Sequence, residues 1–289
     1  MLEEEIYKSG ELDSGSILLL VHAQQYAVMA GRWLAQKRSS LTEVQCQRKK
    51  YYVDLVTEFD LGCERMLTEW VESRFPEHLI LAEEGTADRL VDLAKMTQEE
   101  RYCWVIDPLD GTTNFVHGIP HFAVSIGIVK GGEPLVGVVY DPNRNELFSA
   151  VRGMGATVND RKLVVSEERE LRDSLINTGF SAQDLFGDNM VRPELSQMYK
   201  RCQSVRISGS SALDLAYLSA GRIDGFWHWR LAPWDIAAGV LFVQEAGGKV
   251  TDLEGQPFRF GRDVLVASNG SIHGELLGAL KTSPGCGEV

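Results

Sequence analysis

The chain has 289 residues, 44% of them hydrophobic and 24% charged, which is ordinary for a globular protein with a large buried core. A formal net charge of −12 without a long basic block disfavours non-specific binding to nucleic acid or to an anionic membrane. The five cysteines include no CxxC pair, so we expect neither disulfides nor structural zinc. The acidic N-terminus lacks the basic region of a signal peptide, and the apolar run at 17–21 is too short to span a bilayer. We therefore expect a cytoplasmic protein.

The first part of the chain mixes helical and extended patterns. Apolar residues at helical spacing predict a helix over 16–37, and residues 53–57 are a short extended candidate. Asp60 is expected to cap a second helix that ends near Pro76. Two apolar runs predict strands on either side of a polar segment: strands at 79–82 and 104–106, and the polar segment at 86–101.

From residue 122 the pattern changes to strands joined by turns and then to an alternation of strands and helices. Strands are expected at 122–129, 135–140, 146–151 and 163–165, with turns at Lys130–Pro134, Gly153–Gly155 and Asn159-Asp160. In the second half, strands are expected at 175–178, 205–207, 225–229, 249–252 and 264–267, and helices at 188–201, 210–220, 234–246 and 272–280. We therefore expect an α+β half, residues 1–155, and an α/β half, residues 156–289, that share an interface.

The most informative stretch is Trp104–Phe115, with the sequence WVIDPLDGTTNF. It places Asp107 and Asp110 three residues apart, on a Pro-Leu corner after a strand-like run. Carboxylates at such a strand end can converge, and hard cations such as Mg²⁺ prefer oxygen ligands. The alternative is that Asp107 only caps a turn and Asp110-Gly111 only forms one. The run from Gly111 could also open a helix whose free N–H groups face an anion.

Other acids follow apolar runs in the same way. Glu83 and Glu84 come after the run at 79–82, although adjacent acids are usually only solvated. Asp235 follows Pro233-Trp234, where an acid can also simply interact with a helix dipole. Four or more acids at the ends of apolar segments together favour a site that holds more than one metal ion.

Four further positions are weaker candidates, each with an ordinary alternative. Lys49 can be a solvated surface lysine, and Asp60 can be only a helix cap. Gly209-Ser210-Ser211 can cradle a phosphate or can simply cap a helix. His228, in Phe226–Trp229, is more often a packed residue than a ligand. The chain lacks the GxxxxGK[ST], HExxH and GxSxG motifs and a complete GxGxxG, which disfavours kinase-like, zincin and α/β-hydrolase functions.

Over roughly residues 50 to 270, the chain resembles the inositol monophosphatase family of lithium-sensitive, Mg²⁺-dependent phosphatases. The motifs that carry the resemblance are Asp54–Asp60 (DLVTEFD), Ala82–Gly85 (AEEG), Trp104–Gly118, Pro233–Gly239 (PWDIAAG) and Glu245–Gly248 (EAGG). The resemblance implies a layered αβαβα sandwich of the inositol monophosphatase and fructose-1,6-bisphosphatase type. It also implies a homodimer with two to three Mg²⁺ ions per subunit.

The resemblance further implies roles for individual residues. The metal ligands would be Glu83, Asp107, the carbonyl of Leu109, Asp110 and Asp235. The catalytic residues that orient the attacking water would be Glu84 and Thr112, with Asp60 behind Thr112. The substrate-binding residues would be Lys49, Gly111, Thr112, Gly209, Ser210, Ser211 and His228.

The implied substrate is a small polyol phosphate monoester, with inositol 1-phosphate first. The chain departs from the inositol-preferring pattern at His228, where those relatives carry glutamate, and at Ser211, where they often carry alanine. The same chemistry on fructose 1,6-bisphosphate, histidinol phosphate, glycerol 2-phosphate or NADP is therefore an alternative. A second alternative is a non-catalytic role as a partner in transcription antitermination, without direct contact to RNA. A structural Ca²⁺-binding protein is disfavoured because no EF-hand loop is present.

Overall fold

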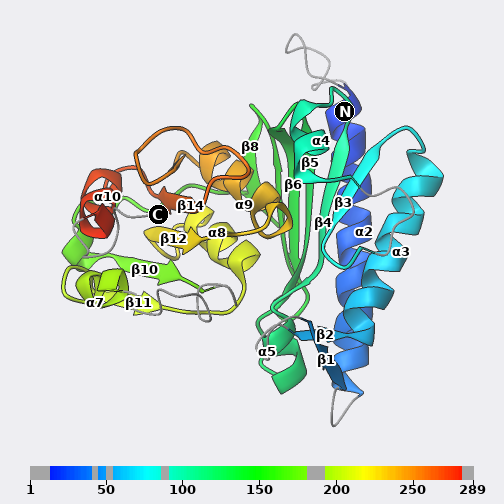
Figure 1. Ribbon diagram of the computed structural model, residues 1–289, viewed down its shortest axis with the longest axis horizontal. Helices are drawn as coiled ribbons and strands as arrows, with labels where there is room; N and C mark the ends of the chain where they lie inside the picture. The colour runs from blue at the N-terminus through cyan, green and yellow to red at the C-terminus, as the bar shows by residue number, and fades with distance from the viewer. Residues whose placement is uncertain (1–13, 41–44, 50–54, 86–90, 181–192, 282–289) are drawn as a thin grey trace.

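The structure is a computed structural model that describes residues 14–40, 45–49, 55–85, 91–180 and 193–281. Its helices and sheets stack in five layers, which Figure 1 shows from right to left. The layers are a helical pair, a large sheet, a second helical pair, a smaller sheet and a third helical pair. This arrangement confirms the layered αβαβα sandwich that the sequence predicts.

The outer helical layer consists of α2 (Ser14–Ser39) and α3 (Glu58–Arg74), which cover one face of a seven-stranded sheet. The fully buried Ala23, Ala27 and Ala30 allow α2 to lie close to this sheet. Its strands run in the order β3 (Leu79–Ala82), β4 (Cys103–Asp110), β5 (Ala123–Lys130), β6 (Glu133–Asp141), β7 (Glu146–Val151), β8 (Gly155–Val158) and β9 (Arg161–Lys162). Strands β3 and β4 are parallel, whereas β4 to β9 pair antiparallel with their neighbours.

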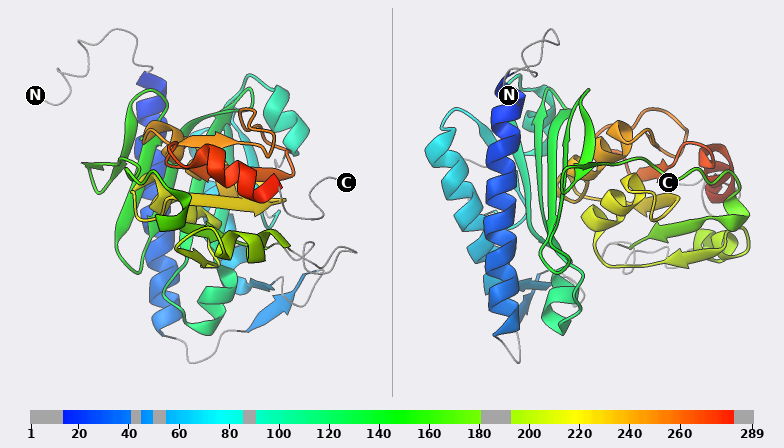
Figure 2. Two further views of the ribbon diagram at one scale, coloured as in Figure 1. Left: turned by 90° about the vertical axis from the view of Figure 1, so that its left-hand side faces the viewer. Right: turned by 180° about the vertical axis from the view of Figure 1, so that it is seen from behind.

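The second helical layer lies between the two sheets and consists of α8 (Ser211–Ser219) and α9 (Pro233–Glu245), as Figure 2 shows. Two glycines let α9 approach the large sheet closely. A Cβ atom on Gly127 would lie 2.5 Å from the Cβ of Ala237, and one on Gly137 would lie 3.0 Å from the Cα of Ala238. A larger residue at either position would push α9, and the acid in its first turn, away from the sheet.

The smaller sheet has five strands in the order β11 (Ser204–Arg206), β10 (Leu175–Thr178), β12 (Gly225–Trp229), β14 (Val264–Ser268) and β13 (Lys249–Thr251). Its outer face is covered by α7 (Pro193–Tyr199) and α10 (His273–Lys281). The remaining short elements are β1 (Cys46–Arg48), β2 (Leu55–Thr57), α4 (Leu93–Gln98), α5 (Thr112–His117) and a 3₁₀ turn at Leu171–Asp173. None of the described helices has both the length and the apolar composition needed to cross a lipid bilayer.

The expected helix cap at Asp60 is wrong, and the cap of α3 is Thr57. The Thr57 hydroxyl accepts hydrogen bonds from the amides of Phe59 and Asp60, while the Asp60 carboxylate accepts one from the Thr57 amide. This reciprocal arrangement is a capping box, in which Asp60 is the third helical residue. The exchange leaves Asp60 buried, with one carboxylate oxygen directed to the start of its own helix.

The expected strand at 163–165 is also wrong. Asn159 and Asp160 have φ values of 46° and 64°, and this tight turn pairs β9 with β8 before residue 163. The large sheet thus ends with β9, at Lys162. The expected strand at 104–106 continues to residue 110, and the polar segment contains α4. Residues 53 and 54 of the extended candidate, residues 86–90 of the polar segment and residues 188–192 of the expected helix lie outside the described residues.

Candidate active site

The site begins at the end of β4, where Asp107 and Asp110 are the fifth and last residues of the strand and are both buried. The pairing of β4 with β5 is irregular between these two aspartates, so the strand is locally distorted there. The Asp107 carboxylate accepts a hydrogen bond of 3.0 Å from the Leu109 amide, and the Cys63 thiol donates one of 3.3 Å to the Pro108 carbonyl. These contacts fix the corner that separates the two aspartates.

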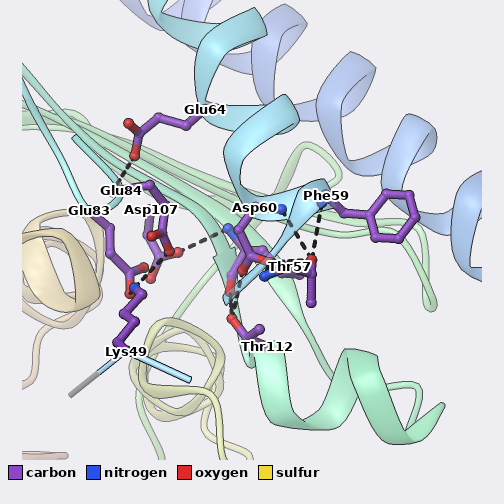
Figure 3. Close-up of polar contacts among 10 residues, drawn as sticks. Lys49, Thr57, Phe59, Asp60, Glu64, Glu83, Glu84, Asp107 and Thr112 are labelled. Carbon is purple, nitrogen blue, oxygen red and sulfur yellow. Dashed lines mark hydrogen bonds and ion pairs between the residues drawn. The ribbon is translucent and has the colours of Figure 1, made fainter. Parts of the chain in front are cut away.

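Glu83 and Glu84 follow β3 at the same edge of the sheet, because β3 and β4 run parallel. The Lys49 ammonium group bridges them, 2.9 Å from Glu83 Oε1 and 2.8 Å from Glu84 Oε1 (Figure 3). On the other side, the buried Glu64 of α3 accepts a hydrogen bond of 2.5 Å from the backbone amide of Glu84. The glutamate pair is therefore held through both its side chains and its backbone.

Thr112, at the start of α5, is in direct contact with Asp60. Its hydroxyl donates to Asp60 Oδ1 at 2.8 Å and lies 3.1 Å from the carbonyl oxygen of Leu109 (Figure 3). The other carboxylate oxygen of Asp60 accepts from the amide and the hydroxyl of Thr57. Burial raises the pKa of Asp60, and the hydrogen bonds from Thr57 and Thr112 oppose this rise.

Asp110 is held by the first turn of α8, from the second half of the chain. Its Oδ2 accepts hydrogen bonds from the Ser210 hydroxyl and, at 2.8 Å, from the Ala212 amide. Ser210 is also the cap of α8 and accepts from the Leu213 amide at 3.4 Å. Burial raises the pKa of Asp110 to about 6, and the hydrogen bonds from Ser210 and Ala212 oppose this rise. The sequence left two roles open for Ser210, phosphate binding and helix capping, and the structure shows Ser210 as the cap of α8.

Asp235 comes from the first turn of α9, where its Oδ2 accepts a hydrogen bond of 2.8 Å from the Ala232 amide. Burial raises the pKa of Asp235 well above its usual range, and the negative charges of Glu83 and Asp110 add to the rise. The pKa of Asp107 is raised in the same way, by burial and then by the charges of Glu83, Asp110 and Asp235. These four acids therefore form one interacting cluster, named here the acid cluster.

Buried carboxylates that repel one another favour a bound cation, and carboxylate and carbonyl oxygens suit Mg²⁺. Within the described part of the chain, no three acidic, histidine or cysteine side chains already stand in an arrangement that could hold a metal ion. Glu83 is bound to the Lys49 ammonium group instead, which brings one positive charge to the acid cluster. The oxygen atoms of the acid cluster therefore suit a hard divalent cation. In the structure, the positive charge of Lys49 partly offsets the negative charge of the cluster.

Helix α5 begins at Gly111, whose φ of 96° lies in the left-handed region. A Cβ atom there would lie 3.0 Å from the carbonyl oxygen of His121 and 3.3 Å from that of Gly209, so glycine is required. The Asn114 side chain donates to the carbonyls of His121 and Ser208, at 2.8 and 3.0 Å. These contacts bring Gly111 and Gly209, both predicted to face the substrate, side by side.

His228 is a packed residue of β12 and is 5% exposed. Its Nδ1 lies 2.7 Å from the Trp229 carbonyl oxygen, and its ring stacks on Phe226 with centroids 6.2 Å apart. The ring also lies against Gly179, where a Cβ atom would be 2.7 Å from Nε2. Ser211 is the first residue of α8 and is partly buried.

Several supporting residues were not predicted from the sequence. Glu64 supports Glu84 over a separation of 20 residues, and Asn114 contacts a carbonyl 94 residues away. Asp214 of α8 is buried and accepts a hydrogen bond of 2.7 Å from the Asn177 side chain. No local sequence pattern reports such contacts. A threonine three residues before an acid is a capping-box signal, however, and could have identified Thr57.

Comparisons with known proteins agree with this geometry. The model of the inositol monophosphatase family matches residues 18–284. The chain is 43% identical to an inositol-1-monophosphatase of Synechocystis over 83% of this chain and 81% of the relative. It is 42% identical to a fructose-1,6-bisphosphatase/inositol-1-monophosphatase of Thermotoga maritima, over 80% and 84%. It is also 42% identical to the Nus factor SuhB of Pasteurella multocida, over 79% and 83%.

A solved structure shows the same fold. The inositol monophosphatase from Anabaena (Nostoc) superposes with a TM-score of 0.81 at 39% sequence identity. The match covers 94% of this chain and 98% of the Anabaena chain.

Proposed function

The chain belongs to the inositol monophosphatase family and is a phosphoric monoester hydrolase, and we propose that it hydrolyses small polyol phosphates with the help of Mg²⁺. Inositol 1-phosphate is the first candidate substrate. The single observation that carries the proposal is the acid cluster, in which Asp107 and Asp110 are buried and Glu83 and Asp235 are partly buried, next to the Thr112–Asp60 contact. The first half supplies three of its acids, and the second half supplies Asp235.

We assign the acid cluster and the Leu109 carbonyl to two or three Mg²⁺ positions. Asp107 is the central ligand, because the charges of the other three acids all act on its carboxylate. Two Mg²⁺ ions bound here would neutralise the phosphate dianion, activate a water molecule and stabilise the leaving alkoxide. Such stabilisation is needed because phosphate monoesters hydrolyse extremely slowly without a catalyst, and enzymes accelerate the slowest of them by up to ~10²¹-fold.

Thr112 and Glu84 are assigned to orient the attacking water. Because the Thr112 hydroxyl donates its proton to Asp60, its lone pairs can accept a hydrogen bond from that water. Burial, and then the charge of Glu83, raise the pKa of Glu84 to about 7, so its carboxyl group can accept a proton near neutral pH. The Lys49 contact opposes this rise.

No protein nucleophile is required for this reaction. Cys63, whose thiol contacts the Pro108 carbonyl between the two aspartates, is fully buried. Burial, followed by the charge of Asp60, raises the pKa of Cys63 well above its usual range, so its reactive thiolate is disfavoured. Direct attack by water is therefore the chemistry that this site supports. The amides of Gly111 and Thr112, at the start of α5, are assigned to the phosphate oxygens.

We infer that residues outside the acid cluster determine which phosphate ester is preferred. The Thermotoga relative carries the names of two activities, on fructose 1,6-bisphosphate and on inositol 1-phosphate, so one family site can accept both. His228 and Ser211 are assigned to the polyol side, with Lys49, Gly209 and Ser210 at its border. An imidazole stands there where inositol-preferring relatives carry a carboxylate, and it can replace the hydrogen bond from a ring hydroxyl only in part.

The test is release of inorganic phosphate from a panel of esters at saturating Mg²⁺. The panel holds inositol 1-phosphate, glycerol 2-phosphate, fructose 1,6-bisphosphate, histidinol phosphate and NADP. The proposal expects the highest kcat/KM for a small polyol monophosphate, and no turnover after chelation of divalent cations. Turnover of none of these esters at any Mg²⁺ concentration would refute it.

A second role is supported by the Nus factor name of the Pasteurella relative. Such a role would use the surface of the protein and not the acid cluster, and the net charge of −12 disfavours a direct grip on RNA. A variant without phosphatase activity that still supports antitermination of ribosomal RNA transcription would establish this role. From the family resemblance alone we also propose a homodimer and sensitivity to Li⁺; light scattering of the purified protein tests the former.

A further inference from the structure

Helix α5 carries Thr112 and the two amides that are assigned to the phosphate, yet it has only six residues. A helix this short has almost no stability of its own, so its position depends on contacts from other elements. Two such contacts, those of Thr112 with Asp60 and of Asn114 with Ser208, lie in its first turn. The last turn needs a contact of its own.

Arg38 supplies that contact from the last turn of α2. The C-terminal end of α2 lies beside α5 in both views of Figure 2. The half-buried Arg38 side chain donates from Nε to the Phe115 carbonyl oxygen at 2.7 Å. Gly118 ends α5 with a φ of 73°, and a Cβ atom on it would collide with Nη2 of Arg38. The guanidinium group is therefore packed directly against the end of α5.

The chemistry of this contact is favourable on two counts. The last carbonyls of a helix carry partial negative charge, so a guanidinium group there is both a hydrogen-bond donor and a matching charge. The Phe115 carbonyl oxygen also accepts a hydrogen bond of 3.1 Å from the Gly118 amide, and a carbonyl oxygen can accept two hydrogen bonds, so Arg38 adds the second. The Phe115 ring is fully buried between Phe59 and Phe122, with centroids 5.6 and 5.1 Å away. Because the Phe115 ring is held in the core, the contact of its carbonyl with Arg38 has a fixed position. Phe115 and Thr112 both belong to the six-residue α5, so this contact also holds Thr112 in place.

We propose that Arg38 is a positioning residue that fixes α5, and through it Thr112 and the amides of Gly111 and Thr112, against the reacting phosphate. This inference rests on the proposed function. Arg38 contacts the end of α5 at Phe115 and Gly118, so its removal is expected to affect the orientation of water and phosphate and not the binding of the metal. A displacement of about 1 Å at a reacting group can cost about 100-fold in rate.

The test is Arg38→Ala with chemical rescue. We expect kcat to fall about 10- to 100-fold, while the KM for inositol 1-phosphate and the half-saturating Mg²⁺ concentration change less than about threefold. Low millimolar guanidinium chloride, far below denaturing levels, should restore much of kcat by filling the space that the side chain leaves. Sodium chloride at equal ionic strength and urea should not. Arg38→Leu occupies that space without a donor and should not respond to guanidinium.

Lys37→Ala is the matched control, because Lys37 is the neighbouring cation of the same turn and its ammonium group lies over Trp33, not on α5. It should leave kcat unchanged. Amide hydrogen exchange of the metal-free protein gives a readout without turnover: exchange at residues 115–119 should be faster in Arg38→Ala and slower again with guanidinium. A kcat within twofold of the wild type overturns the inference, and so does a loss that neither guanidinium nor Arg38→Lys restores. A wild type that hydrolyses no ester refutes the proposed function instead, and the exchange experiment then still tests the contact.

Discussion

The Ser210 hydroxyl donates a hydrogen bond to Asp110, which joins an acid of the large sheet to the first turn of a helix in the next layer. The Ala212 amide donates to the same carboxylate oxygen. The Asp110 carboxylate is thus held by the start of α8. The geometry of the acid cluster therefore depends on how the two halves of the chain pack, as well as on the DPLDG corner.

Ser210→Ala should weaken Mg²⁺ binding. Removal of a donor that supports a metal-binding carboxylate costs about 10- to 100-fold in metal affinity, so the half-saturating Mg²⁺ concentration should rise about tenfold. Ser210→Thr retains the hydroxyl and serves as the control. Titration of Mg²⁺ in the initial-rate assay measures the effect. Equal half-saturating concentrations in the wild type and Ser210→Ala would show that the contact does not support the ligand.

His228→Glu should shift specificity toward inositol 1-phosphate. A carboxylate restores the acceptor found in inositol-preferring relatives, and one hydrogen bond to a substrate hydroxyl is worth about 1–3 kcal/mol, or roughly 5- to 150-fold in kcat/KM. Hydrolysis of glycerol 2-phosphate should change little, since the acid cluster is untouched. The measurement is kcat/KM for both substrates on both variants. If the two values rise or fall together, His228 is only the packed strand residue that its contacts with Phe226 and Gly179 describe.

Li⁺ should inhibit turnover at millimolar concentrations and nearly uncompetitively. The physical reason would be that Li⁺ occupies, after the substrate has reacted, one of the proposed Mg²⁺ positions, to which we assign Asp107, Asp110 and Asp235. Excess Mg²⁺ should inhibit for the same reason, if the phosphate product must leave with that metal. Initial rates measured against both cations test this expectation. Absence of both effects would place the chain among lithium-insensitive phosphatases.

His273 should make stability depend on pH between about 6.5 and 4. Its ring nitrogens lie 2.9 Å from the Thr251 hydroxyl and 2.8 Å from the Ser268 hydroxyl, and burial, followed by the charge of Lys249, lowers its pKa to about 4. As pH falls below 6.5, the unfolded chain takes up a proton that the folded protein does not, so the free energy of unfolding decreases. From pH 7 to 5 the decrease should be about 1–2 kcal/mol.

The control for this prediction is His273→Gln, which can keep a hydrogen bond to either hydroxyl but does not titrate. Urea unfolding of both proteins at pH 7 and pH 5 gives the comparison, with other titrating groups common to both. The pH dependence should be smaller in the variant by about 1–2 kcal/mol. An equal dependence in the two proteins would contradict the assignment of this effect to His273.

The sequence was most informative where chemistry and local pattern coincide. Asp107 and Asp110 follow an apolar strand, and the structure places them at the end of β4. The resemblance predicts the layered fold, whereas propensity alone misplaces a strand at 163–165, because the turn at Asn159 and Asp160 starts the pairing with β8 earlier, at Arg161 and Lys162. An acid at the start of a helix can be its cap or the third residue of a capping box, and Asp60 is the latter because Thr57 stands three residues before it.

Long-range contacts explain what local patterns could not supply. The donation of Ser210 to Asp110 spans 100 residues, and that of Arg38 to Phe115 spans 77. Each depends on the packing of separate layers, which no window of sequence encodes. The same holds for Lys49, which the sequence alone does not distinguish from a solvated surface lysine. It becomes the counter-charge of Glu83 and Glu84 only because the fold brings the end of β1 next to them.

The most direct test of the central claim is turnover by Asp107→Asn at saturating Mg²⁺, with the exposed Glu133→Gln on the same sheet as control. Because Asp107 interacts with all three other acids, we expect kcat/KM for inositol 1-phosphate to fall at least about 1,000-fold with the fold intact by circular dichroism. Thermal stability without metal should be unchanged or higher, since like-charge repulsion is relieved. Turnover within about tenfold of the wild type would contradict the account.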